Sequence, residues 1–254
     1  MTFIDDSNTE YERAVAFKGE TLQGPMFAMN GFGDLSNEEF VARHSGGLPV
    51  ENILIENRAE DSYLRTSEAN QKLEKTSLGQ TQFVPRIRNQ GSCGSCWSFA
   101  AVLELENNYF RQTKTYVDLS QQELIDCEVH SNGCMGGYAE SAYNYAAYFG
   151  LLRASEYPYV GAKGNCRSTY SEKRIRFTNM VHTNFTGFSP AIAKAASDRR
   201  VLASLFLKSD LKFRYLSNSD DIFDARLSGE CNMASNHIVG MWYFDNGVIT
   251  VINS

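Results

Sequence analysis

Cysteine spacing is the feature of this 254-residue sequence that most constrains its fold. Five of the six cysteines fall within positions 93–166. Such a density favours disulfides in an oxidising compartment or a metal site in a reducing one. The six are Cys93, Cys96, Cys127, Cys134, Cys166 and Cys231.

Two of these cysteines lie in the stretch NQGSCGSCWSFAA, residues 89–101, which allows three interpretations. A redox pair usually lies near a βαβ pattern, which the sequence lacks. A zinc site would add Cys127 and Cys134, but this second pair is spaced more widely than the pairs of zinc fingers. In the third interpretation Cys93 forms a disulfide that fixes the loop. Cys96 is then a nucleophile at the start of a buried helix, where the helix dipole lowers the thiol pKa.

Composition narrows the classes of function. Hydrophobic residues make up 43% of the chain, which is enough for a packed core. The formal charge of −6 comes with no basic stripe, which argues against nucleic acid as a partner. No apolar run is long enough for a membrane span, and no signal peptide is visible at the start. We expect a signal either to be absent or to precede a chain that starts inside a longer precursor.

The first part of the chain has the pattern of a leader followed by a linker. Ser36 and Glu39 form a capping box, which predicts a helix that begins directly after Ser36. Residues 56–79 are polar and charged, which is typical of an exposed linker. We therefore expect two domains, residues 1–70 and residues 71–254.

The pattern of residues 90–150 predicts a mainly helical region. The apolar run from Trp97 indicates a buried helix. Ser120 forms a second capping box with Glu123 and predicts a helix over QQELIDC. The stretch AESAYNYAAYFG is typical of a helix that Gly150 closes.

The pattern of the C-terminal part of the chain is mainly that of strands. Residues 201–209 predict one strand, and HIVGMWYF and VITVINS flank an Asn-Gly pair, which indicates a hairpin. The hairpin brings its ends together, so we expect His237 and Asn253 to be neighbours, in a register that the sequence leaves open. A helical half followed by a β half predicts an α+β protein with two subdomains and a cleft between them.

A thiol nucleophile at Cys96 needs a base and a group that orients the base. His44 lies in the leader, and His130 and His182 lie in polar surroundings, so we expect all three to be solvated surface residues. His237 is the remaining candidate, although without Cys96 it would be read as a structural histidine at a strand end.

The stretch QGSCGSCW, residues 90–97, resembles the active-site signature of papain-like cysteine proteases. The stretches DLSQQELIDC, GCMGGY, EYPYVGAKGNC, SNHIVGMW and VINS follow in that family's order and at similar spacing. MNGFGDLSNEEF is similar to the end of the inhibitory pro-segment of cathepsin L-like members. The resemblance implies a papain-like fold with a helical subdomain over about 90–170 and a β-barrel-like one over about 171–254.

The resemblance also implies a role for each residue at a matching position. Cys96 would attack the peptide carbonyl, and His237, held by Asn253, would be its imidazolium partner and then the acid that protonates the leaving amine. Gln90 would donate its side-chain amide to the oxyanion. Substrate would bind to the glycines that pair with its backbone and to an apolar pocket for the residue two before the scissile bond, formed together by Gly136, Gly137, Tyr138, Ala139 and Ile238.

The same resemblance implies the disulfides Cys93–Cys134 and Cys127–Cys166. The sequence departs from the family pattern at its ends, because the family continues past Asn253 with Trp-Gly and further strands, and its pro-segment begins earlier. We therefore expect a chain truncated at its C-terminal strands and preceded by a partial inhibitory pro-segment, with Cys231 unpaired.

Three functions compete on these observations. The first is a cysteine endopeptidase that hydrolyses peptide bonds through a Cys-His-Asn site and is made as a latent zymogen, cut within residues 65–80. The second is a catalytically impaired relative that binds peptides or proteases as an inhibitor. The third is an oxidoreductase in which Cys93 and Cys96 bond to each other. The four active-site residues favour the first, and the truncation favours the second.

The first function implies a set of partners and a location. The partners would be peptide or protein substrates, the chain's own pro-segment as inhibitor, and cystatin-like inhibitors, with no cofactor and no metal. The family resemblance implies a lysosome, an endosome or the outside of the cell.

Overall fold

The computed structural model describes residues 37–47, 83–167, 173–177, 203–207, 236–245 and 248–254. Its elements are α2 (Asn37–His44), α4 (Cys96–Thr113), α5 (Gln121–Cys127), α6 (Ala139–Phe149), β1 (Ala203–Leu207), β2 (His237–Asp245) and β3 (Val248–Ile252). The expected linker, the domain boundary, His182 and Cys231 lie outside the described residues. None of the helices in the described part of the chain is long and apolar enough to cross a membrane.

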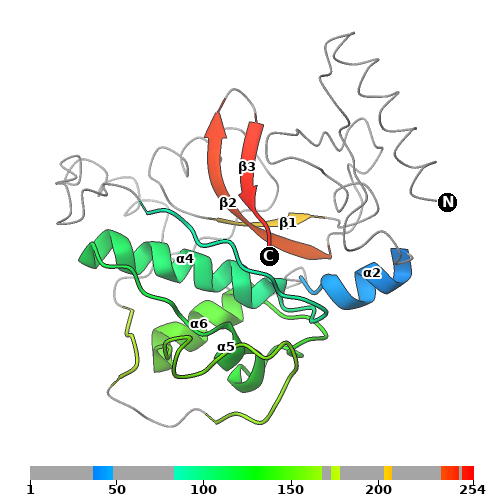
Figure 1. Cartoon of the computed structure of the whole chain (residues 1–254), viewed down its shortest axis with the longest axis horizontal. Coiled ribbons are helices and arrows are strands. Elements are labelled where there is room, and N and C mark those ends of the chain that lie inside the picture. Colours follow the sequence, from blue (N-terminus) through cyan, green and yellow to red (C-terminus); the bar gives the residue numbers. More distant parts are fainter. Residues whose placement is uncertain (1–36, 48–82, 168–172, 178–202, 208–235, 246–247) are drawn as a thin grey trace, which may run out of the picture.

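Helix α4 is the centre of the structure. It packs against β2 on one side and against α5 and α6 on the other, so it separates the sheet from the shorter helices (Figure 1). Most of its side chains are buried, as the apolar run from Trp97 predicts. The helix ends at Thr113, and the next residue, Lys114, has a left-handed φ of 58° and donates its N–H to the carbonyl of Phe110.

Helices α5 and α6 cover the far side of α4. Ser120 caps α5, because its hydroxyl accepts a hydrogen bond from the N–H of Glu123 at 2.9 Å. The expected capping box is only half formed, because the Glu123 carboxylate turns inward and accepts from the N–H of Leu152 at 2.7 Å. Helix α6 ends at Gly150, which has a φ of 75°, as the sequence predicts.

The three strands form one antiparallel sheet in the order β1-β2-β3. Strand β1 lies within the stretch expected to be a strand, and β2 and β3 are the two arms of the expected hairpin. The pairing of β2 with β3 shifts between Met241 and Tyr243. A bulge displaces every later pair by one residue, so the alternation of side chains alone does not predict this register.

A short segment links α2 to the rest of the structure. Helix α2 begins at Asn37, as expected, and is followed by Ser45, Gly46 and Gly47, which we call the strap. The N–H groups of Gly46 and Gly47 each donate to the carbonyl of Asn236 at 3.0 Å, and the carbonyl of Gly46 accepts from Gly137 at 2.9 Å. The strap therefore bridges the start of β2 and the loop before α6, with α2 beside the start of β2 (Figure 1).

Candidate active site

Cys96 is the first residue of α4 and is fully buried. The structure fixes its loop from two directions. Gly94 donates its N–H to the carbonyl of Cys134 at 2.9 Å, and the indole N–H of Trp97 donates to the carbonyl of Gly133 at 3.1 Å. These contacts hold the start of α4 against residues 133–137, so the position of the thiol is set by packing rather than by a side-chain cap.

Two disulfides distinguish the interpretations of the cysteines. Cys93 is bonded to Cys134 and Cys127 to Cys166, the pairs that the family resemblance implies. Cys96 is the free cysteine among the described residues. The zinc and redox interpretations both need sulfur atoms that these bonds occupy, so the structure excludes them.

Burial raises the pKa of the Cys96 thiol to about 11. Hydrogen bonds from the backbone, first that of Ile238 and then that of Gly46, oppose this rise without cancelling it. The backbone groups of Cys96 and Trp97 at the helix start lower this pKa, as we expect, but the net shift is upward because desolvation by burial outweighs them. The thiol is therefore neutral at physiological pH in this arrangement.

His237 and Asn253 lie at the two ends of the hairpin and are in contact. The ring Nε2 of His237 lies 2.7 Å from the Asn253 side-chain oxygen. Because this oxygen can only accept, Nε2 carries the proton and Nδ1 is left as the basic atom. Nδ1 is buried and has no hydrogen-bond partner among the described residues. Burial lowers the pKa of His237, the bond to Asn253 opposes this, and the charge of His44 adds to it.

Gln90 is buried, and its side chain is held by three groups. Its Nε2 donates to the carbonyls of Cys93 at 2.9 Å and His44 at 3.0 Å, and its Oε1 accepts from the Ser254 hydroxyl at 2.6 Å. One amide hydrogen thus fixes the loop, and the other points to a carbonyl of the leader. Sequence analysis missed Ser254, whose only signal is that it follows Asn253.

Two of the expected substrate-binding residues, Gly137 and Ile238, lie against the strap. Gly137 has no room for a side chain, since an added Cβ would lie 2.5 Å from the Trp97 ring. A Cβ at Gly47 would lie 2.4 Å from the Ile238 side chain, so the strap passes directly over that residue. Gly136, with a φ of 111°, precedes Gly137, Tyr138 precedes α6, and Ala139 is buried in the same cluster as Ile238 and Cys96.

The strap and its preceding histidine are the part of the site that sequence analysis missed. His44 was expected to be solvated, and this is wrong: its ring is half-buried and stacks on Phe40 with the ring centres 5.1 Å apart. The adjacent glycines at 46 and 47 were the available signal, because a Gly-Gly pair marks a place where backbone approaches backbone closely. His130 is exposed, as expected.

The chain belongs to the papain family of cysteine proteases, because the family model described as "Papain family cysteine protease" matches residues 71–246. It is 39% identical to caricain of Carica papaya over 55% of this chain and 39% of that protein. It is 34% identical to cathepsin L 2 of Paramecium tetraurelia over 78% of this chain and 61% of that protein. The chain thus spans about two fifths of the length of the first curated relatives.

A solved structure shows the same fold. Digestive procathepsin L 3 of Tenebrio molitor superposes with a TM-score of 0.68 at 24% identity, over 97% of this chain and 77% of that one. The α+β fold with a helical and a β subdomain, expected from the sequence, is therefore confirmed.

Proposed function

We propose that this chain is the latent form of a cysteine endopeptidase. The observation that carries the proposal is the gathering of four groups beneath the strap: the Cys96 thiol at the start of α4, the His237–Asn253 pair at 2.7 Å and the Gln90 amide. Cys96 and Gln90 come from the helical half and the other two from the sheet.

The chemistry follows from these groups once the strap leaves. Cys96 gives its proton to His237 Nδ1 and attacks the peptide carbonyl carbon, so that the carbonyl electron pair moves onto oxygen. The second Nε2 hydrogen of Gln90 and the N–H of Cys96 stabilise that oxyanion. The intermediate collapses to a thioester as His237 protonates the leaving amine, and water then hydrolyses the thioester with His237 as base.

Latency would follow from what the strap occupies. The carbonyl of His44 takes the Gln90 hydrogen, the carbonyl of Gly46 takes the Gly137 N–H, and two N–H groups take the Asn236 carbonyl. These are donors and acceptors that a bound peptide needs. Burial also raises the pKa of Cys96 and lowers that of His237, and both shifts disfavour a thiolate–imidazolium pair.

Substrate preference would come from the apolar residues beside the strap. Tyr138, Ala139 and Ile238 favour a hydrophobic or aromatic side chain two residues before the scissile bond. Substrates would then be peptides or proteins, the chain's own leader an inhibitor, and cystatin-like proteins possible regulators. A lysosomal, endosomal or extracellular setting fits two disulfides in the described part of the chain.

Covalent labelling tests the proposal. The purified full chain would be treated with an epoxysuccinyl peptide inhibitor at mildly acid pH, before and after limited pepsin digestion, with peptide mass mapping and a fluorogenic hydrophobic-Arg substrate. We expect labelling at Cys96 and turnover only after digestion, and neither in the matched Cys96→Ser variant. A folded chain that is never labelled and never hydrolyses substrate would contradict the proposal and favour the alternative, a peptide- or protease-binding relative.

A further inference from the structure

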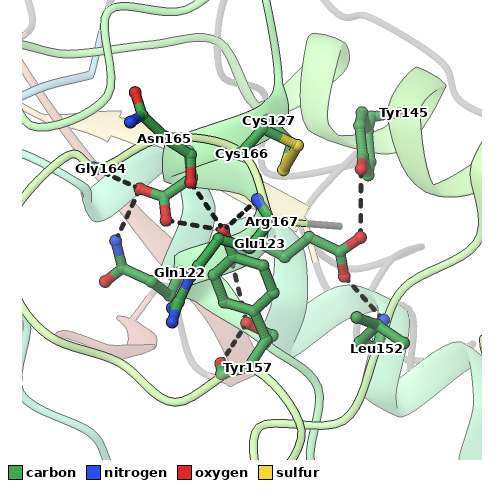
Figure 2. The surroundings of a disulfide bond; sticks show 12 residues. Gln122, Glu123, Cys127, Tyr145, Leu152, Tyr157, Gly164, Asn165, Cys166 and Arg167 are labelled. Carbon is green, nitrogen blue, oxygen red and sulfur yellow. Dashed lines mark hydrogen bonds between the residues drawn. A yellow bond between two sulfur atoms is a disulfide. The ribbon is translucent and has the colours of Figure 1, made fainter. Parts of the chain in front are cut away.

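Two tyrosines, Tyr157 and Tyr159, lie two residues apart in the same irregular segment and hold different parts of the helical subdomain. The Tyr157 hydroxyl donates to the Asp126 carboxylate at 2.8 Å, beside the disulfide Cys127–Cys166 (Figure 2). The Tyr159 hydroxyl lies instead against the loop that precedes α4. The two side chains therefore offer a matched comparison between a bond far from the site and a bond next to it.

Tyr159 joins the two ends of the loop that carries the candidate oxyanion donor. Its hydroxyl donates to the main-chain carbonyl of Gln90 at 2.5 Å and lies 3.2 Å from the Ser95 hydroxyl. The carbonyl can only accept, so the tyrosine proton goes to Gln90. The single Ser95 hydroxyl hydrogen has two acceptors within reach, the phenol oxygen at 3.2 Å and the carbonyl of Cys93 at 3.3 Å. Ser95 immediately precedes Cys96, so one phenol oxygen links the residue of the oxyanion donor to the residue before the nucleophile.

Packing keeps the Tyr159 hydroxyl in this place. Its ring meets the Phe99 ring of α4 edge to face, with centres 5.0 Å apart. Desolvation raises the pKa of Tyr159, so the phenol stays protonated and continues to donate. On the inner side of the same loop, the Gln90 amide donates to the carbonyl of Cys93. The loop is thus held by two hydrogen bonds, one from the Gln90 side chain to Cys93 and one from the Tyr159 hydroxyl to the Gln90 carbonyl.

We propose that Tyr159 is a positioning residue for the oxyanion site: its hydroxyl sets the distance between the Gln90 amide and the Cys96 N–H. This inference rests on the proposed function. A displacement of about 1 Å in such a pair costs up to about 100-fold in rate, and complete loss of one donor costs about 100- to 1000-fold. Tyr159 acts through Gln90, so the loss on removing its hydroxyl is smaller than the loss on removing Gln90.

The test compares Tyr159→Phe with Tyr157→Phe, because each removes one hydroxyl and keeps the ring. Both are made in the full chain, activated identically, and active sites are counted with the epoxysuccinyl inhibitor. For Tyr159→Phe we expect kcat to fall about tenfold with KM within about twofold of the wild type. For Tyr157→Phe we expect an unchanged kcat. Equal kcat values for the two variants would overturn the inference.

A double-mutant cycle separates positioning from general stability. Gln90→Ala keeps the main-chain carbonyl that Tyr159 binds but lacks the amide. In this background Tyr159→Phe is expected to cause no further loss of kcat. The same tenfold loss in both backgrounds would mean that the hydroxyl acts through the fold alone, and the inference would fail.

Hydrogen exchange gives a readout that does not need turnover. In the intact chain, the amides of residues 90–95 are expected to exchange faster in Tyr159→Phe than in Tyr157→Phe. Unchanged exchange would overturn the inference whatever the activity. A wild-type chain that shows no activity after activation would instead overturn the proposed function. The role of this loop in positioning the oxyanion donors would then fall with it.

Discussion

The main-chain carbonyl of His44 accepts a hydrogen bond at 3.0 Å from the side-chain amide of Gln90, 46 residues further along the chain. A group of the leader thus engages the donor that we assign to the oxyanion. The contact makes the strap more than a steric cover, because it satisfies a buried polar group that would otherwise need water or substrate. Four predictions test this arrangement and the fold that supports it.

The first prediction concerns the space around Gly46. A Cβ at this position would lie 1.9 Å from the carbonyl oxygen of Gly94, and a backbone atom cannot move aside as a flexible side chain can. Gly46→Ala should therefore displace the strap and raise the rate of Cys96 labelling in the uncut chain at least about tenfold, equivalent to about 1.4 kcal/mol.

The control for this variant is Gly164→Ala. An added Cβ there would meet only the Asp126 carboxylate at ordinary contact distances of 3.5–3.8 Å. It should leave the labelling rate unchanged. Equal rates for Gly46→Ala and the wild type would mean that the strap does not control access to the thiol.

The second prediction is a loss of latency in acid. Burial lowers the pKa of His237 beneath the strap, from an ordinary value of 6.5, so the covered form binds this proton more weakly than the open form. The free energy that favours the covered form over the open form is therefore largest above pH 6.5, and it decreases as the pH falls through the lowered pKa. Hydrogen-exchange protection of residues 136–138 in a Cys96→Ser chain, corrected for intrinsic rates, should decrease over this range. Helix α5 serves as the internal reference, and a constant ratio would refute the linkage.

The third prediction concerns the thiol itself. Because the pKa of Cys96 is raised to about 11, its alkylation by iodoacetamide in the intact chain should stay slow at neutral pH and rise only in strong alkali. After removal of the leader the midpoint should fall below the ordinary value of 9.0. Rates are followed by peptide mapping so that other cysteines are scored separately. A midpoint that is the same before and after cutting would show that the strap does not desolvate the thiol.

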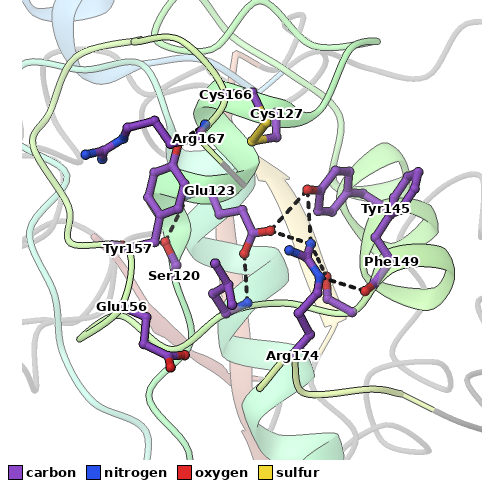
Figure 3. A network of polar contacts seen from close by, with 12 residues as sticks. Ser120, Glu123, Cys127, Tyr145, Phe149, Glu156, Tyr157, Cys166, Arg167 and Arg174 are labelled. Atoms are coloured by element: carbon purple, nitrogen blue, oxygen red, sulfur yellow. Dashed lines mark hydrogen bonds and ion pairs between the residues drawn. A yellow bond between two sulfur atoms is a disulfide. The ribbon is translucent and has the colours of Figure 1, made fainter. Parts of the chain in front are cut away.

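The fourth prediction concerns a buried ion pair in the helical subdomain. Arg174 and Glu123 lie 2.5 Å apart with almost no exposure, and the Arg174 side chain also donates to the carbonyls of Phe149 and Gly150 (Figure 3). Arg174→Met would leave a buried carboxylate without its cation, which costs about 3–5 kcal/mol in the free energy of unfolding. Chemical denaturation measures this loss.

The neighbouring residue supplies the control. Lys173 lies 3.7 Å from Glu156 with 78% of its side chain exposed. Lys173→Met should cost no more than about 1 kcal/mol, as is usual for a surface pair. Equal losses for the two variants would show that the buried pair contributes no more than an ordinary surface one.

The sequence predicts the parts of this fold that local patterns encode. The apolar run gives α4, Gly150 gives the end of α6, and the two apolar arms give the β2–β3 hairpin, because each depends on residues close together in the chain. The neighbourhood of His237 and Asn253 follows from the hairpin and is found at 2.7 Å. The register shift near Met241 does not follow, since no local pattern in the sequence marks it.

Contacts between segments that lie far apart in the chain could not be predicted from the sequence. Nothing local indicates that the Ser254 hydroxyl reaches Gln90, or that Glu123 turns from its own helix cap to Arg174. The net direction of the Cys96 pKa shift also does not follow from the sequence, because it depends on how deeply the folded chain buries the thiol. For Glu123 and Cys96, a tertiary effect outweighs a local tendency that the sequence does indicate.

The strap meets the site through main-chain atoms. Its hydrogen bonds come from the N–H groups of Gly46 and Gly47 and from the carbonyl of Gly46, with one more from the carbonyl of the preceding His44, and its two glycines present no side chain to the neighbouring pocket. A segment that binds in this way carries no information about which side chain the pocket prefers. The same strap would therefore fit peptidases that prefer different side chains. A change in the substrate preference of such an enzyme would require no matching change in its inhibitory segment.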